Sequence, residues 1–152
     1  MADHILVTGG LGYIGSHCVI ELIEEGSSVV IVDNLNNSNI KCLDRLHEIT
    51  GKPDQIVFKQ IDLLDVKTLE EEVFKNFKIS SVIHFAAHKA VGESVAKPLD
   101  YYHNNVCATV TLLKLMQKYG CKCFVFSSSA CVYGENPECV EGDTIQPINP
   151  YG

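Results

Sequence analysis

The stretch that decides the fold is HILVTGGLGYIG, residues 4–15. Its first part, His4 to Val7, predicts a short buried strand, and the glycines that follow predict a turn. From Gly12 onward, apolar residues recur at helical spacing as far as Ile23, so a helix is expected to begin inside the glycine loop. A strand, a glycine-rich turn and a helix are the first unit of an α/β fold.

The same alternation continues along the chain. Further strands are predicted at residues 29–32, 56–61, 81–86 and 123–126, and further helices at residues 40–50, 65–77 and 98–119. Because the strands are apolar on both faces, we expect a parallel sheet with helices on both sides. The predicted fold class is a doubly wound, Rossmann-like α/β domain over residues 1–152, ending after its fifth strand. Beyond Gly134 the residues are typical of turns, and no further strand or helix is predicted.

Composition excludes several classes of protein. The chain has 152 residues, 12 Lys and Arg against 19 Asp and Glu, and a net charge of -7. Nucleic-acid binding is not expected, because it relies on clustered cations and the chain has no basic block. No apolar stretch approaches the roughly 20 residues that span a bilayer. We therefore expect a soluble, cytoplasmic protein that binds neither nucleic acid nor membrane.

The seven cysteines are an odd number spread through predicted helices, strands and loops. This distribution favours free thiols in a reducing compartment over a disulfide framework. Cys121 and Cys123 are the only close pair, and no histidine lies at a spacing that would complete a zinc site. No metal is expected.

The glycine loop has the chemistry of a dinucleotide site. Gly9, Gly12 and Gly15 would let the backbone turn sharply and bring the start of a helix, which favours anions, against a pyrophosphate. Asp33 ends the second strand 18 residues after Gly15, where a carboxylate can accept hydrogen bonds from an adenosine ribose. The alternative is a turn-rich connection and a strand-ending aspartate without a ligand.

The spacing Gly9-x-x-Gly12-x-x-Gly15 resembles that of the extended branch of the short-chain dehydrogenase/reductase superfamily. Three further stretches, residues 82–94, 97–105 and 126–134, make the chain similar to the UDP-glucose 4-epimerases of that branch. The resemblance covers the whole chain, which is less than half the length of such an enzyme.

The resemblance implies NAD as the cofactor and assigns roles to individual positions. Gly9, Gly12, Tyr13, Ile14 and Gly15 would line the pyrophosphate. The residues implied at the adenosine end are Asp33, Asn34, Asn37, Ser38, Asp62 and Leu63. Those implied beside the pyrophosphate and the nicotinamide ribose are Phe85, Ala86, Lys89, Asn104, Ser127 and Tyr151.

The resemblance also implies a reaction, the interconversion of UDP-glucose and UDP-galactose through a 4-keto intermediate. Ser129 would bind the sugar 4-hydroxyl and Tyr151 would be the catalytic base. The family's lysine lies four residues after this tyrosine, beyond Gly152, so the 152 residues alone are expected to be inactive. Two departures lie beside the site: Ala87-His88 replaces the family's Gly-Leu, and Cys131 replaces its usual Thr.

Two alternatives stay open at this stage. A nucleotide-sugar 4,6-dehydratase would need an acid and a base just after the serine, where this chain has Ala130 and Cys131. A non-catalytic NAD-binding module would need only the nucleotide half.

Further expectations concern the partners and the cofactor. The resemblance implies a UDP-sugar substrate and, in the full-length protein, a homodimer that pairs through the helix at residues 98–119. We expect NAD rather than NADP, because the carboxylate of Asp33 would repel a 2′-phosphate. In the 152 residues alone, a fifth strand at the sheet edge, containing Phe124 and Phe126, is expected to promote aggregation.

Overall fold

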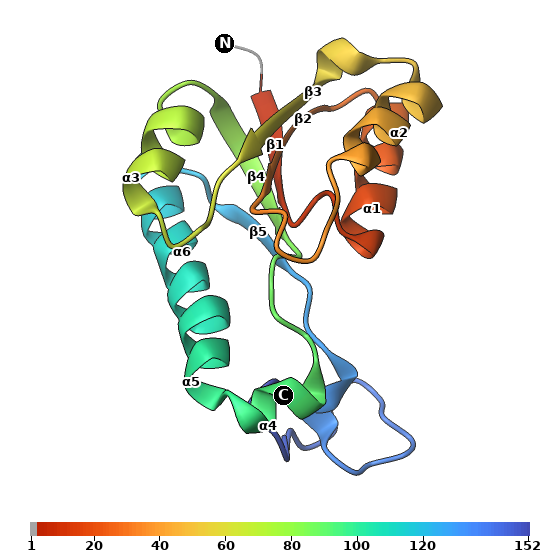
Figure 1. The fold of residues 1–152 in the computed structure, drawn as a ribbon, viewed down its shortest axis with the longest axis vertical. Helices are drawn as coiled ribbons and strands as arrows, with labels where there is room; N and C mark the ends of the chain where they lie inside the picture. The colour runs from red at the N-terminus through yellow and green to blue at the C-terminus, as the bar shows by residue number, and fades with distance from the viewer. Residues whose placement is uncertain (1–2) are drawn as a thin grey trace.

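The structure is a computed structural model that describes residues 3–152. Its centre is a parallel five-stranded sheet in the order β3-β2-β1-β4-β5 (Figure 1). The strands are β1 (Asp3–Thr8), β2 (Ser28–Asp33), β3 (Ile56–Gln60), β4 (Lys78–His84) and β5 (Cys123–Phe126). The predicted doubly wound α/β fold is confirmed, with β5 at one edge of the described sheet.

Helices cover both faces of the sheet. On one face α1 (Tyr13–Glu24) and α2 (Lys41–Thr50) pack against side chains such as Val7 and Ile31. On the other face α3 (Val66–Leu69) and α6 (Ala108–Tyr119) pack against Leu6 and Val30. Consecutive strand residues therefore belong to different core clusters, because side chains alternate across a strand. This is why the central residues of β1 and β2 form unbroken apolar runs.

Two short helical turns lie next to β3 and α3 in the chain. The turn η1 (Pro53–Gln55) precedes β3, and the π-helical turn η2 (Glu70–Phe74) continues α3. Asp65 begins that helix as its N-cap, since its carboxylate accepts a hydrogen bond from Thr68 N at 3.1 Å.

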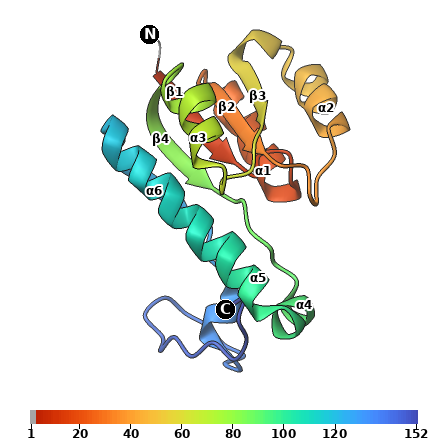
Figure 2. The ribbon, with the colours of Figure 1, turned by 60° about the vertical axis from the view of Figure 1, so that its left-hand side comes forward.

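The helix predicted at residues 98–119 forms over its whole length. It consists of α5 (Pro98–Tyr101), the π-helical turn η3 (Tyr102–Cys107) and α6, and it ends at Gly120 with φ of 73°. Figure 2 shows it as one long rod that extends past the sheet. Its far end lies beside α4 (Val91–Ala96) and the C-terminal segment, which contains η4 (Ala130–Tyr133).

The structure differs from the sequence prediction at β4 and α4, and the short turns η1 and η4 were not predicted either. The fourth strand, predicted at residues 81–86, spans Lys78–His84, so Phe85 and Ala86 belong to the loop that leaves the sheet. The short helix α4 was not predicted, because its six residues include Gly92 and are too few to show a period.

Three further observations concern residues 3–152. None of their helices is long and apolar enough to cross a membrane. All seven cysteines are free thiols. No group of three or more histidine, cysteine or carboxylate side chains in this part of the chain is arranged to hold a metal ion.

Candidate functional site

A cavity of about 310 Å³ lies where β1, β2 and β4 end, at the carboxyl edge of the sheet. The connections after β1 and β4 leave toward opposite faces, and such a switch point is where open α/β sheets bind ligands. Every residue predicted to bind the dinucleotide lines this cavity: Gly9, Gly12, Tyr13, Ile14, Gly15, Asp33, Asn34, Asn37, Ser38, Asp62, Leu63, Phe85, Ala86, Lys89, Asn104, Ser127 and Tyr151.

The glycine loop is packed too tightly to admit side chains. A Cβ atom on Gly9, whose φ is +69°, would lie 2.8 Å from Ala86 N, and one on Gly15 would lie 2.2 Å from Gly9 O. The glycine loop is therefore in close contact with its own backbone and with the loop that follows β4. Gly12 is the N-cap residue just before α1 and has no side chain that could bond to the first turn. Backbone N–H groups at this helix end are therefore available to an anion. The loop fits the diphosphate of a dinucleotide.

Asp33 ties two loops together beneath the cavity. Its carboxylate accepts hydrogen bonds from Leu11 N at 3.1 Å, Leu35 N at 2.9 Å and Ser38 Oγ at 2.7 Å. These contacts use three of the roughly four acceptor positions of a carboxylate. One position is left for a ligand such as a ribose hydroxyl, and the side chain is only 8% exposed.

The adenosine end of the predicted site is also ordered by hydrogen bonds. Asp62 Oδ2 accepts a hydrogen bond from Asn34 Nδ2 at 3.0 Å, and its Oδ1 accepts one from Leu64 N at 2.9 Å. Leu63, between these residues, is 6% exposed and supplies an apolar wall. A polar pair beside an apolar wall suits a nucleoside, whose ring is flat and whose sugar carries hydroxyls.

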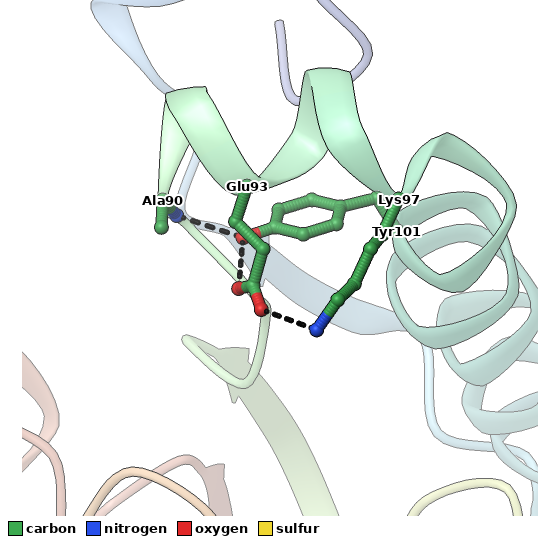
Figure 3. A network of polar contacts seen from close by, with 4 residues as sticks. All are labelled: Ala90, Glu93, Lys97 and Tyr101. Carbon is green, nitrogen blue, oxygen red and sulfur yellow. Dashed lines mark hydrogen bonds and ion pairs between the residues drawn. The ribbon is translucent and has the colours of Figure 1, made fainter.

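The loop that follows β4, residues 85–90, lines the cavity with its first five residues and contacts the glycine loop at Ala86. Phe85 N donates a hydrogen bond to Thr8 O at 3.0 Å, which keeps the loop against β1 as it leaves the sheet. Farther along, side chains of the long helix hold the loop: Asn105 bonds to the backbone of His88, and Tyr101 bonds to Ala90 N (Figure 3). Lys89 stands between these two attachments.

A buried histidine links the sheet to the long helix just behind the cavity. The His84 ring nitrogens lie 2.6 Å from Thr8 Oγ1 and 2.9 Å from Thr109 Oγ1. Burial lowers the pKa of His84 to about 4. The ring is therefore neutral at pH 7, with one nitrogen accepting and the other donating.

The two predicted catalytic residues occupy different positions. Tyr151 lines the cavity together with Ser127. Ser129 is not among the lining residues, and its Oγ accepts a hydrogen bond from Cys131 N at 3.1 Å, so it caps η4. Its hydroxyl proton remains available to a second partner, because the oxygen acts as the acceptor in this contact.

Seven lining residues were not predicted: Val32, Asn36, Ile61, Ala87, His88, Ala108 and Ser128. All but one are chain neighbours of predicted residues, so an extension of each predicted stretch by one position would have included them. Ala108 lies four residues after Asn104, on the same face of the long helix, and helical spacing was the available signal.

Comparisons with known proteins agree with this geometry. Residues 6–152 match the model of a family described as GDP-mannose 4,6 dehydratase. "UDP-glucose 4-epimerase 2" of Arabidopsis thaliana is 53% identical over 155 residues, covering 100% of this chain and 44% of the relative. "UDP-glucose 4-epimerase" of Dictyostelium discoideum is 54% identical over 153 residues, covering 99% of this chain and 43% of the relative. The chain thus spans less than half the length of these relatives.

Solved structures show the same similarity. The UDP-glucose 4-epimerase of Bifidobacterium longum, described as a complex with NAD+ and UDP, superposes with a TM-score of 0.91 at 46% identity. The match covers 97% of this chain and 44% of that one. The enzyme of Stenotrophomonas maltophila, described with bound NAD and formylated UDP-arabinopyranose, gives a TM-score of 0.90 at 43% identity, over 97% of this chain and 44% of that one.

Proposed function

The chain belongs to the family described as GDP-mannose 4,6 dehydratase, and from that premise we propose that the protein is an NAD-dependent UDP-glucose 4-epimerase. This chain would supply its dinucleotide-binding domain, residues 1–152. The observation that supports the proposal most strongly is the cavity at the carboxyl edge of the sheet, lined by the glycine loop, Asp33 and Tyr151. The relatives that match 99–100% of this chain are named UDP-glucose 4-epimerase, which supports the same reaction.

The residues of the cavity suit a dinucleotide along its length. The backbone N–H groups of Tyr13 and Ile14, in the first turn of α1, would bind the diphosphate. The free acceptor position of Asp33 would bind the adenosine ribose, and its charge would disfavour a 2′-phosphate. When bound, NAD supplies the acceptor and donor of hydride at the sugar C4.

Tyr151 and Ser129 would handle the proton of the sugar 4-hydroxyl. A phenol oxygen can accept this proton when nearby positive charge favours the phenolate. The Ser129 hydroxyl, with its oxygen held by Cys131 N, would orient the sugar hydroxyl or relay its proton. The same pair would return the proton after the flat 4-ketone has presented its other face.

A 4,6-dehydratase is the second candidate, because the family description names that reaction. Elimination of water needs an acid and a base near the serine. The two residues that follow Ser129 are Ala130 and Cys131, which offer no carboxyl group. This absence of a carboxyl pair favours the epimerase.

A homodimer in the cytoplasm is part of the proposal. Val106, Val110 and Leu113 follow one another at helical spacing on the outer side of the long helix and are 53%, 42% and 41% exposed. Apolar side chains in such a row suit a helix that packs against a second copy. Sedimentation of the full-length protein tests the dimer. The cytoplasmic location is supported by the seven free thiols, which favour a reducing compartment.

The deciding experiment supplies UDP-galactose and, separately, GDP-mannose to the full-length protein with NAD. Formation of UDP-glucose supports the epimerase. Formation of a 4-keto-6-deoxy sugar overturns it in favour of the dehydratase. NAD binding without either product overturns it in favour of a non-catalytic binding module.

A further inference from the structure

Lys89 is the only lysine or arginine among the residues that line the cavity. The carboxylates of Asp33 and Asp62 line the same cavity, so its acidic side chains outnumber its basic one. A ligand with a diphosphate brings further negative charge. The affinity of the cavity for such a ligand therefore depends on where the single ammonium group, that of Lys89, lies.

Lys89 has an exposed, flexible side chain and lies in a loop without regular structure, residues 85–90. Ordering such a side chain on a ligand costs conformational entropy. The cost is lower when the backbone that carries it is already fixed, which is the general benefit of preorganisation.

Asn105 fixes the peptide groups just before Lys89. Its Oδ1 accepts a hydrogen bond from His88 N at 2.8 Å, and its Nδ2 donates one to His88 O at 2.9 Å. The backbone N–H and C=O of His88 are thus both paired with the side chain of Asn105. Asn104 Nδ2 donates to the same Oδ1 at 2.8 Å, which sets the orientation of the Asn105 amide.

Tyr101 fixes the backbone just after Lys89. Its hydroxyl accepts a hydrogen bond from Ala90 N at 3.1 Å and donates one to Glu93 Oε2 at 3.0 Å (Figure 3). Glu93 also pairs with Lys97 at 3.2 Å. The tyrosine side chain is 2% exposed, and its ring lies against that of His88 with centroids 5.5 Å apart.

Tyr101 and Asn105 are four residues apart on one helix, so they present the same face to the loop. Neither residue lines the cavity. Both bond to the residues on either side of Lys89, so both can act on a ligand through the loop, and Asn105 in addition contacts Asn104, which lines the cavity.

We propose that Tyr101 and Asn105 are positioning residues that hold Lys89 against the diphosphate of the bound dinucleotide. The inference rests on the proposed dinucleotide site and extends it to two residues outside the cavity. Tyr101 and Asn105 would raise the affinity for the dinucleotide by fixing the backbone on both sides of Lys89.

The test is a double-mutant cycle read by calorimetry with two probes, NAD and ADP. Loss of the charged contact in Lys89→Met is expected to weaken both about tenfold, as is typical of a charge-assisted contact. Asn105→Leu and Tyr101→Phe are each expected to weaken both probes several-fold in the unmodified background and to have no further effect in the Lys89→Met background. Tyr101→Phe keeps the buried ring, so it remains informative if Asn105→Leu unfolds.

Lys114→Met and Gln117→Leu are the matched controls, since they remove a charge and an amide from exposed positions on the same long helix, outside the cavity. Both are expected to leave binding of either probe unchanged.

The outcomes separate the inference from the proposed function. Additive losses, or no loss in Lys89→Met, overturn the inference while NAD binding by the unmodified protein leaves the proposed function in place. Coupled losses for ADP in a protein that does not bind NAD support the inference and overturn the proposed function. Failure of both probes to bind overturns both.

Discussion

Asp33 Oδ2 accepts a hydrogen bond from the backbone N–H of Leu11 at 3.1 Å, joining the end of β2 to the glycine loop that follows β1. The two residues are separated by the whole of α1 in the chain, yet this contact fixes the loop against the neighbouring strand. A residue expected only to bind a ribose therefore also shapes the diphosphate site. The same carboxylate holds Leu35 N and Ser38 Oγ on the opposite side.

Asp33→Asn should reduce the preference for NAD over NADP. The amide keeps one oxygen as an acceptor but removes the charge that repels a 2′-phosphate. The dissociation constant of NADP divided by that of NAD should therefore fall by about tenfold or more. Calorimetry with both dinucleotides measures this ratio. Tighter binding of NADP than of NAD by the unmodified protein would contradict the assignment of Asp33.

Gly15→Ala should damage both the fold and the cofactor site. The new Cβ would lie 2.2 Å from Gly9 O, so the backbone of the glycine loop must move. Overpacking of this kind costs about 1–3 kcal/mol of unfolding free energy. Denaturant unfolding and NAD affinity should both show a loss.

Gly92→Ala is the matched control for this prediction. An added Cβ at Gly92 meets nothing within 4 Å, and the residue lies in α4. Stability should be unchanged or slightly raised, because alanine favours a helix more than glycine does. Equal losses in the two variants would refute the steric argument.

The sequence predicted the sheet and the cavity because both depend on local patterns. Apolar runs, glycine stops and the spacing from Gly15 to Asp33 place the ends of β1 and β2, and the parallel topology then brings them to one edge. The stretches recognised by resemblance supplied further lining residues, including Lys89 and Asn104.

The supports behind the cavity could not be predicted in the same way. Tyr101 reaches Ala90 and Asn105 reaches His88 across 11 and 17 residues of chain, and no spacing rule connects them. Two of the three contacts of Asp33, those from Leu35 N and Ser38 Oγ, come from the loop in which Leu35 has a φ of 61°. Such contacts follow from how helices and loops pack in three dimensions.

Ser129→Ala should lower kcat of the full-length protein by at least about tenfold while leaving the dissociation constant of NAD unchanged, since the hydroxyl acts only on the sugar. The change also removes the cap on Cys131 N, which costs about 1 kcal/mol of stability. Ser129→Thr is the control, because it retains both the cap and the hydroxyl. Full turnover in Ser129→Ala would exclude the hydroxyl from the reaction.

Lowering the pH from 6.5 to 4 should destabilise the protein through His84. The histidine has its ordinary pKa of 6.5 in the unfolded chain and a pKa of about 4 in the folded protein, because it is buried between Thr8 and Thr109. In this window the unfolded state binds a proton that the folded state does not, so the unfolding free energy falls as the pH falls. The loss is complete below the folded pKa and amounts to about 3 kcal/mol.

Urea unfolding at a series of pH values measures this loss, with His84→Gln as the variant that removes the titration. The pKa values of four carboxylates, Asp3, Asp65, Glu70 and Glu93, are lowered from the ordinary 3.8 of Asp and 4.5 of Glu by nearby hydrogen bonds and positive charge. Their stabilising contacts are lost only as the pH falls through these ordinary values and below, so the upper part of the window reports His84. Between pH 6.5 and 5 the unmodified protein should lose stability steeply and His84→Gln should lose little. Parallel curves for the two proteins in this range would show that another group carries the pH dependence and that His84 does not enter the folded state as a neutral link between β1 and the long helix.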